Sequence, residues 1–136
     1  VVMVTEKGML KGKKILVAED EPDIRGLVAY SLEYAGCEVI QALNGDEAIE
    51  LAESEQPDLI LLDVRMPRLN GYEACAVLRS RESTRDIPIV FLSARGQETE
   101  IRRGLDMGAE EYILKPFAPD DLYQRVGSIL ERLERE

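Results

Sequence analysis

Five short apolar segments, each followed by a stretch of helical periodicity, constrain the fold of this chain more than any other feature. The segments are rich in β-branched residues and leucine, and they cover residues 14–18, 38–42, 58–63, 87–92 and 111–114. Several of the runs are continuously apolar, which is typical of strands that are buried on both faces of a parallel sheet. The sequence therefore predicts a strict alternation of strands and helices.

The predicted helices have recognisable start and stop signals. Pro22 suits the first position of the first helix, and Gly36 suits its C-terminal end. Asn44, with Glu47 three residues later, resembles a capping box at the start of the second helix. The other helices are predicted to follow Gly71, to span residues 98–107 with Gly108 as the stop, and to begin near Pro119.

Five strand–helix units imply right-handed crossovers and a single doubly wound parallel sheet of the α/β class. For a chain of 136 residues, we expect the flavodoxin-like strand order 2-1-3-4-5 with five helices. Residues 1–12 are expected to form a flexible N-terminal tail, and residues 13–136 to form one domain. Such sheets bind ligands outside the carboxyl ends of their strands, so functional residues are expected there.

Polar residues gather at this predicted edge. Glu19 and Asp20 follow the first strand, Asp63 ends the third, Ser93 follows the fourth, and Lys115 follows the fifth. Each alone has an ordinary explanation as a turn or cap residue. Strands one and three are neighbours in the expected order, however, so the three acidic residues should converge. Close carboxylates raise one another's pKa unless a cation neutralises them, and Mg²⁺ prefers such oxygen ligands.

The composition excludes several classes of function. A formal net charge of −10 argues against direct nucleic-acid binding by this domain. The absence of histidine excludes Ser–His and Cys–His catalysis and histidine metal ligation. Cys37 and Cys75 lie in apolar segments, so we predict buried thiols rather than a disulfide. No apolar run approaches the roughly 18 residues of a membrane span and no signal peptide is recognised, so we expect a cytoplasmic location without membrane association.

Four separated motifs resemble the receiver (phosphoacceptor) domain of two-component response regulators. They are ILVAEDEPDIR, DLILLDVRMPRLNGYE, IPIVFLSAR and GAEEYILKPF, and the resemblance covers about residues 13–133. It implies that Asp63 is the phosphoacceptor. It also implies that Mg²⁺ is held by Glu19, Asp20, Asp63 and the backbone carbonyl of Arg65.

The resemblance assigns roles to further residues. Ser93 and Lys115 are expected to contact the phosphoryl group, Tyr112 to act as the aromatic switch, and the peptide bond before Pro116 to be cis. A sensor histidine kinase or phosphotransfer protein would donate the phosphoryl group from phosphohistidine. Tyr112 would then move inward, and the surface of the fourth helix, fifth strand and fifth helix would change. That surface is also where a homodimer is expected. The domain is not expected to be an enzyme beyond self-phosphorylation from small donors and autodephosphorylation.

Arg65 and Arg95 stand two positions after Asp63 and Ser93 respectively, and we hypothesise that they shield the acyl phosphate and set its lifetime. One alternative function is a degenerate receiver that acts as a phosphorylation-independent adaptor. Another is an Mg-dependent phosphatase with an aspartate nucleophile, which would need a second acid where Arg65 stands. A nucleotide or flavin module is disfavoured, because no glycine-rich loop follows the first strand.

Overall fold

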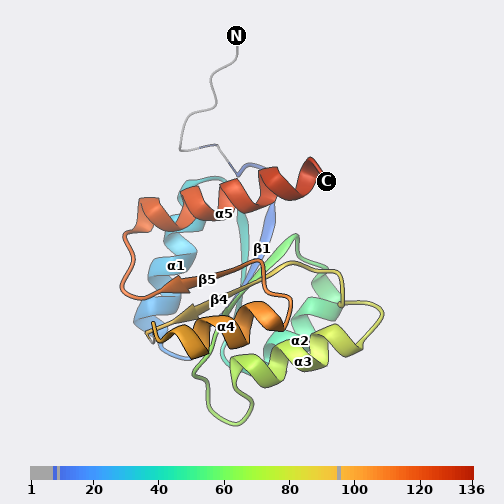
Figure 1. The fold of residues 1–136 in the computed structure, drawn as a ribbon. Helices are drawn as coiled ribbons and strands as arrows, with labels where there is room; N and C mark the ends of the chain where they lie inside the picture. The colour runs from blue at the N-terminus through green and yellow to red at the C-terminus, as the bar shows by residue number, and fades with distance from the viewer. Residues whose placement is uncertain (1–7, 9, 95) are drawn as a thin grey trace.

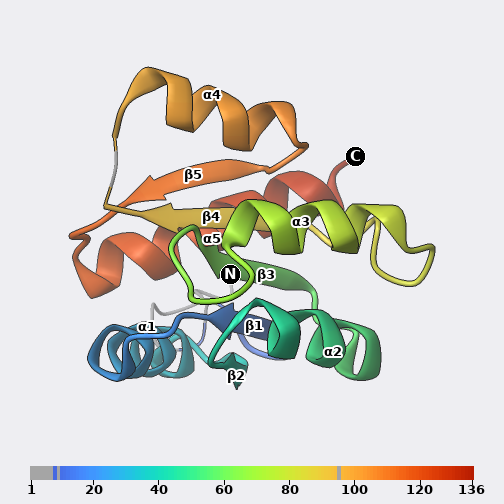
Figure 2. The same cartoon turned by 90° about the horizontal axis from the view of Figure 1, so that it is seen from below.

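The sheet of the computed structural model has the predicted topology. The structure describes residues 8, 10–94 and 96–136, and its five strands are all parallel, in the order β2-β1-β3-β4-β5. The strands are β1 (Lys14–Ala18), β2 (Glu38–Ala42), β3 (Leu59–Asp63), β4 (Ile89–Ser93) and β5 (Glu111–Leu114). In Figure 2 they follow one another from β5, beside α4, to β2. The predicted flavodoxin-like α/β fold is confirmed.

Five helices cover the two faces of the sheet (Figure 1). They are α1 (Pro22–Tyr34), α2 (Gly45–Glu55), α3 (Gly71–Ser80), α4 (Glu98–Asp106) and α5 (Pro119–Glu134). One hydrophobic cluster joins the sheet to α1 and α5, and a second joins it to α2, α3 and α4. The three-layer arrangement follows from the alternation of strand and helix, because each crossover returns to a parallel strand over one face.

The central strands are buried on both faces, as their continuous apolar runs predicted. Every residue of β3 and β4 is buried. Successive side chains point to opposite faces of a strand. Ile15 and Val17 therefore pack with α1 and α5, while Leu16 packs on the other side. The two thiols predicted to be buried, Cys37 and Cys75, are both buried and free.

Several boundaries differ from the predicted ones. β4 begins at Ile89 rather than at residue 87, since Pro88 has no N–H to donate to the ladder. β3 begins at Leu59 rather than at residue 58, whose carboxylate accepts a hydrogen bond from the Lys14 N–H at 2.8 Å. α4 ends at Asp106, shortly before the expected residue 107.

The predicted capping box at α2 is only half formed. Asn44 accepts a hydrogen bond from the Glu47 N–H at 2.9 Å, but the Glu47 carboxylate accepts from Leu43 instead of returning to Asn44. The complete capping box lies at the start of α3, between Asn70 and Glu73.

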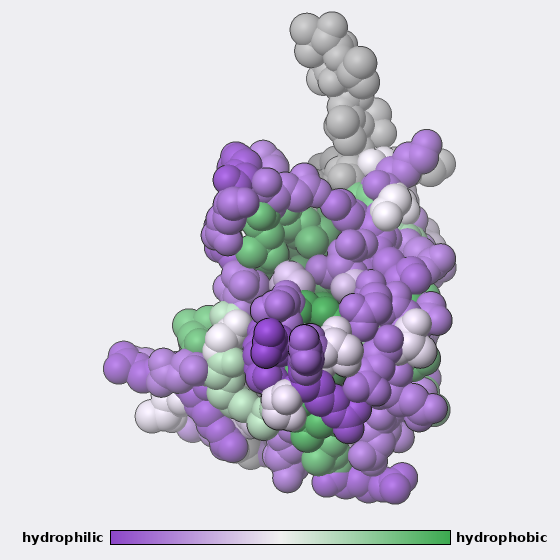
Figure 3. Space-filling view, turned by 90° about the vertical axis from the view of Figure 1, so that its right-hand side faces the viewer, coloured by the Kyte–Doolittle hydropathy of each residue, from purple (hydrophilic) through white to green (hydrophobic). Residues whose placement is uncertain are grey.

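The packed part of the chain includes residue 10, before the expected domain boundary at residue 13. Leu10 is 3% exposed, and its N–H donates to the Ala35 carbonyl at 2.7 Å. Residues 1–7 and 9 of the expected tail lie outside the described residues. None of the helices in the described ranges has the length and apolar character that crossing a membrane requires. On the face shown in Figure 3, hydrophilic residues predominate and hydrophobic residues are visible in separate patches.

Candidate functional site

The acidic pair lies in the loop between β1 and α1. Glu19 is 1% exposed, whereas Asp20 is exposed. The Arg25 guanidinium donates to the Glu19 backbone carbonyl at 2.9 Å, and its Nε donates to the Gln41 side chain at 3.2 Å. Arg25 therefore fastens this loop to β2. Our sequence prediction did not include Arg25, because its role depends on a contact with a different strand.

Asp63 is the last residue of β3 and is 3% exposed. The loop after it returns close to its backbone, since the Gly71 N–H donates to the Val64 carbonyl at 2.9 Å. A Cβ atom at Gly71 would lie 2.3 Å from the Asp63 carbonyl oxygen. Position 71 therefore requires glycine for close backbone approach, besides marking the start of α3.

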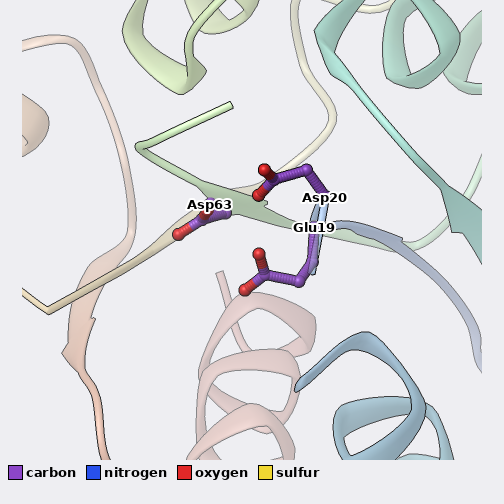
Figure 4. A group of neighbouring side chains, drawn as sticks. All are labelled: Glu19, Asp20 and Asp63. Atoms are coloured by element: carbon purple, nitrogen blue, oxygen red, sulfur yellow. The ribbon is translucent and has the colours of Figure 1, made fainter. Parts of the chain in front are cut away.

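The structure brings together the three acidic residues that the strand order placed at one edge. Carboxylate oxygens of Glu19, Asp20 and Asp63 all lie within 4.8 Å of one another. Figure 4 shows Asp63 at the end of β3, facing Glu19 and Asp20 from the neighbouring loop. A set of hard, closely spaced oxygen donors fits a divalent cation such as Mg²⁺.

Lys115 lies against two of these carboxylates. Its Nζ atom is 2.5 Å from Glu19 Oε1 and 2.9 Å from Asp63 Oδ1. Its side chain is 15% exposed, and the peptide bond between Lys115 and Pro116 is cis. One partly buried ammonium group thus contacts two carboxylates, one from the loop after β1 and one from the end of β3.

Burial disfavours the charged forms of two carboxyl groups in this cluster, Glu19 and Asp63. Burial raises the pKa of Glu19 to about 7 against the opposing hydrogen bond from Lys115, and the Asp63 charge adds to the increase. Burial also raises the pKa of Asp63, although Lys115 lowers it. Burial alone would lower the pKa of Lys115, but its bonds to both carboxylates raise it above the usual value. A bound cation would relieve the remaining repulsion.

The structure also describes three other predicted residues, Ser93, Tyr112 and Arg65. Ser93 ends β4, is 2% exposed, and accepts a backbone hydrogen bond from Lys115 at 2.8 Å. Tyr112 lies inward on β5 at 7% exposure, with its ring centroid 6.2 Å from that of Phe91. Arg65 is exposed and lines a cavity of about 480 Å³ together with Asp20.

Two further residues, Arg95 and Tyr72, distinguish the observed site from the predicted one. Arg95 lies outside the described residues. Tyr72, which we had not predicted to have a role, also lines the cavity, and its hydroxyl is 3.5 Å from that of Tyr112.

The chain is similar in sequence to curated transcriptional regulatory proteins. Among curated proteins, the chain is 46% identical over 122 residues to "Alkaline phosphatase synthesis transcriptional regulatory protein PhoP" of Bacillus subtilis, covering 90% of this chain and 50% of that protein. It is 44% identical over 123 residues to "Phosphate regulon transcriptional regulatory protein PhoB" of Rhizobium meliloti, covering 90% and 54%. The chain thus spans about half the length of the curated relatives it matches.

Solved structures support the same relationship. Chemotaxis response regulator CheY4 of Vibrio cholerae matches with a TM-score of 0.81 at 31% identity, covering 86% of this chain and 98% of that one. The BeF3-activated N-terminal receiver domain of Klebsiella pneumoniae RstA matches with a TM-score of 0.79 at 35% identity, covering 86% and 97%. The family model described as "Response regulator receiver domain" matches residues 15–127. This chain therefore belongs to the family of response regulator receiver domains.

Proposed function

We propose that this domain accepts a phosphoryl group on Asp63, in the presence of Mg²⁺, from the phosphohistidine of a sensor histidine kinase or phosphotransfer protein. The observation that carries the proposal is the position of the Asp63 carboxylate. It lies within 4.8 Å of two further carboxylates and 2.9 Å from the Lys115 ammonium group. A buried aspartate between a cation-binding acidic cluster and a fixed lysine is suited to receive a phosphoryl group.

The chemistry follows from the groups present. A carboxylate oxygen of Asp63 attacks phosphorus, and the bond from phosphorus to the partner's histidine nitrogen breaks. The imidazole leaves with the bonding electrons and takes up a proton, and Asp63 becomes an acyl phosphate. Lys115 offsets negative charge on the phosphoryl oxygens. Glu19, Asp20, Asp63 and the Arg65 carbonyl would hold Mg²⁺, which supplies further positive charge when it is bound.

The same site supports a conformational switch. The Ser93 hydroxyl contacts the phosphoryl group, and the inward position of Tyr112 is favoured as a result. The surface formed by α4, β5 and α5 then changes through a two-state equilibrium. Because the relatives named above are transcriptional regulators about twice as long, we propose that this surface controls transcription when the domain is part of a longer protein.

The lifetime of the acyl phosphate is proposed to depend on Arg65 and Arg95. The exposed Arg65 lines the same cavity as Asp20, so its side chain can restrict the approach of water. An Arg65→Ala, Arg95→Ala double variant should lose its phosphoryl group faster than the wild type. An unchanged rate of dephosphorylation would contradict this role.

The proposed function is tested by incubating the protein with Mg²⁺ and acetyl phosphate or phosphoramidate, followed by acid quenching and intact mass measurement. We expect the mass of one added phosphoryl group, which is absent in Asp63→Ala. Asp58→Ala is a matched control, because Asp58 is exposed just before β3 and its loss should leave the adduct intact. A wild-type protein that gains no mass would favour the adaptor function.

A further inference from the structure

The Tyr72 side chain joins three elements of the fold near the phosphoacceptor. Tyr72 belongs to α3 and is 3% exposed. Its hydroxyl lies 2.9 Å from Glu100 Oε2 on α4 and 3.5 Å from the Tyr112 hydroxyl on β5. One phenol group therefore contacts both α4 and the proposed switch residue.

The ring of Tyr72 adds a second attachment to α4. The Arg103 guanidinium carbon lies 4.2 Å from the ring centroid, an arrangement typical of a cation–π interaction. Glu100 and Arg103 are three positions apart on α4, so they project from the same side of the helix. The Tyr72 ring also makes an apolar contact with Phe91, whose ring centroid is 5.1 Å away.

The direction of each hydrogen bond between these three side chains can be assigned. Burial raises the pKa of Tyr72, and the hydroxyl of Tyr112 and the carboxylate of Glu100 raise it further, so Tyr72 stays a neutral donor. A carboxylate only accepts, so Tyr72 donates its single proton to Glu100. The Tyr72 oxygen is then free to accept from the Tyr112 hydroxyl, which is buried with it.

Tyr72 is also adjacent to the backbone of the phosphoacceptor loop. It follows Gly71, whose N–H bonds to Val64 and whose missing Cβ would lie 2.3 Å from the Asp63 carbonyl oxygen. The hydrogen bond from the Gly71 N–H to the Val64 carbonyl, at 2.9 Å, couples the two segments. A change in the backbone at Asp63 would therefore displace the start of α3 and the Tyr72 side chain with it.

We propose that Tyr72 is a positioning residue that ties α4 to the phosphoacceptor loop and holds Tyr112 inward through the hydroxyl shared with Glu100. It provides a link from Asp63 to the surface of α4, β5 and α5 that does not pass through Ser93. The inference rests on the proposed function, because the inward Tyr112 is the position that phosphorylation is proposed to favour. A ligand that favours the inward position of Tyr112 binds more weakly when a smaller fraction of the protein has Tyr112 in that position.

The test is the affinity for beryllofluoride, a phosphoryl mimic, measured by calorimetry in the presence of Mg²⁺. Tyr72→Phe removes the hydroxyl and keeps the ring. We expect its beryllofluoride affinity to fall about three- to tenfold, which corresponds to the loss of one hydrogen bond. Its affinity for Mg²⁺ alone should be unchanged, which a general structural defect would not produce. Tyr30→Phe is the control, since Tyr30 is 69% exposed on α1.

Glu100→Ala removes the partner of the same hydrogen bond. Because the two residues share one interaction, the double variant should bind beryllofluoride about as weakly as Tyr72→Phe alone. If the losses of beryllofluoride affinity in the two single variants added fully in the double variant, the proposal that Tyr72 and Glu100 act through one hydrogen bond would be overturned. Hydrogen exchange supplies an independent readout without beryllofluoride, and Tyr72→Phe should exchange the amides of residues 98–106 faster than the wild type and Tyr30→Phe.

The outcomes separate this inference from the proposed function. A wild type that binds neither Mg²⁺ nor beryllofluoride would overturn the phosphoacceptor proposal, while the exchange of α4 would still decide whether Tyr72 anchors that helix. A wild type that binds beryllofluoride, with Tyr72→Phe equal to it in both affinity and α4 exchange, would overturn the role of Tyr72 alone.

Discussion

At the scale of single residues, Glu19 has a buried carboxyl group, since the residue is only 1% exposed. Burial raises its pKa from 4.5 to about 7, against the Lys115 hydrogen bond. Between these values the folded state binds more protons than the unfolded state, so this group destabilises the fold as pH rises through that window. In the presence of a chelator, the wild type should lose on the order of 1–2 kcal/mol relative to Glu19→Gln between about pH 5 and about pH 8. Urea unfolding of both proteins measures the difference, and parallel pH profiles would contradict the prediction.

Magnesium should reverse this destabilisation, because it binds the folded site and neutralises the carboxylates. At a concentration of about 100 times its dissociation constant, Mg²⁺ should raise the free energy of unfolding of the wild type by about 2–3 kcal/mol. Thermal or urea unfolding at neutral pH measures the gain. Asp63→Ala lacks one of the three clustered carboxylates and should gain much less. Equal stabilisation of the two proteins would indicate that Mg²⁺ binds elsewhere.

The predictability of individual site residues depended on where their partners lie. Glu19, Asp20 and Asp63 could be placed together because the strand order alone brings the ends of β1 and β3 side by side. Tyr72 could not, because its partner Glu100 is 28 positions away on a helix whose placement depends on side-chain packing. Arg25 could not be predicted for a similar reason, since it donates both to the Glu19 carbonyl and to Gln41 on a different strand.

At the scale of secondary structure elements, α4 approaches the sheet closely only because Gly104 has no side chain. A Cβ atom there would lie 2.9 Å from Phe91 Cδ2 and 3.0 Å from Tyr112 Cδ2. Gly104→Ala should therefore displace α4 and destabilise the protein by about 1–3 kcal/mol. Gly26→Ala on α1 is the matched control, because its Cβ meets nothing within 4 Å, and it should be neutral or stabilising by up to about 1 kcal/mol. Similar unfolding energies for the two variants would contradict the packing argument.

Arg79 connects α3 to two loops through backbone carbonyls. Its guanidinium donates to Arg85 and Ile87 at 2.8 Å each and to Gly108 at 3.2 Å. Arg79→Ala should lower the free energy of unfolding by about 2 kcal/mol, because several carbonyls lose a charged donor. Arg81→Ala, which removes a partly exposed ion pair with Glu53, should cost less than about 1 kcal/mol. Chemical denaturation measures the free energy of unfolding of both variants. An equal loss of stability in the two would contradict the stronger role of Arg79.

Element boundaries were predictable where local chemistry decides them, and less so elsewhere. Gly36 and Gly108 have positive φ angles of 102° and 89° at the ends of their helices, as their positions suggested. The start of β4 was misplaced because the apolar pattern continues through Ile87 and Pro88, although proline cannot pair in the ladder. The capping box at Asn70 was not predicted, although Asn70 and Glu73 have the three-residue spacing of that motif.

At the scale of the whole molecule, strand order was predictable because parallel strands joined by right-handed crossovers allow few arrangements. The surface was not predictable in the same way. A sequence pattern does not distinguish a buried leucine from an exposed one. Three leucines, Leu27, Leu105 and Leu114, are between 41% and 45% exposed. Two of these three belong to α4 and β5, the elements proposed to change on phosphorylation.

Two acidic residues at or just before the start of β5 form ion pairs with arginines of α5 in the same chain. The Glu111 carboxylate accepts from Arg125 Nε at 2.7 Å, and Glu110 pairs with Arg132 at 2.9 Å. The same charges could otherwise form ion pairs across a homodimer. Any such pairing would first have to break the intrachain pairs. Exposed apolar side chains on α4 and β5 would then supply most of the attraction between two subunits.

A dimer held in this way should be induced by the phosphoryl mimic and be insensitive to salt. With Mg²⁺ and beryllofluoride, sedimentation should detect a dimer whose dissociation constant changes less than about twofold between about 0.1 M and 0.5 M salt, because screening acts on charges and not on apolar contacts. Leu114→Asp should abolish it, whereas Leu43→Asp, which is 47% exposed after β2, should not. A monomer in both states would contradict dimerisation, and strong salt dependence would show that cross-subunit ion pairs replace the intrachain ones.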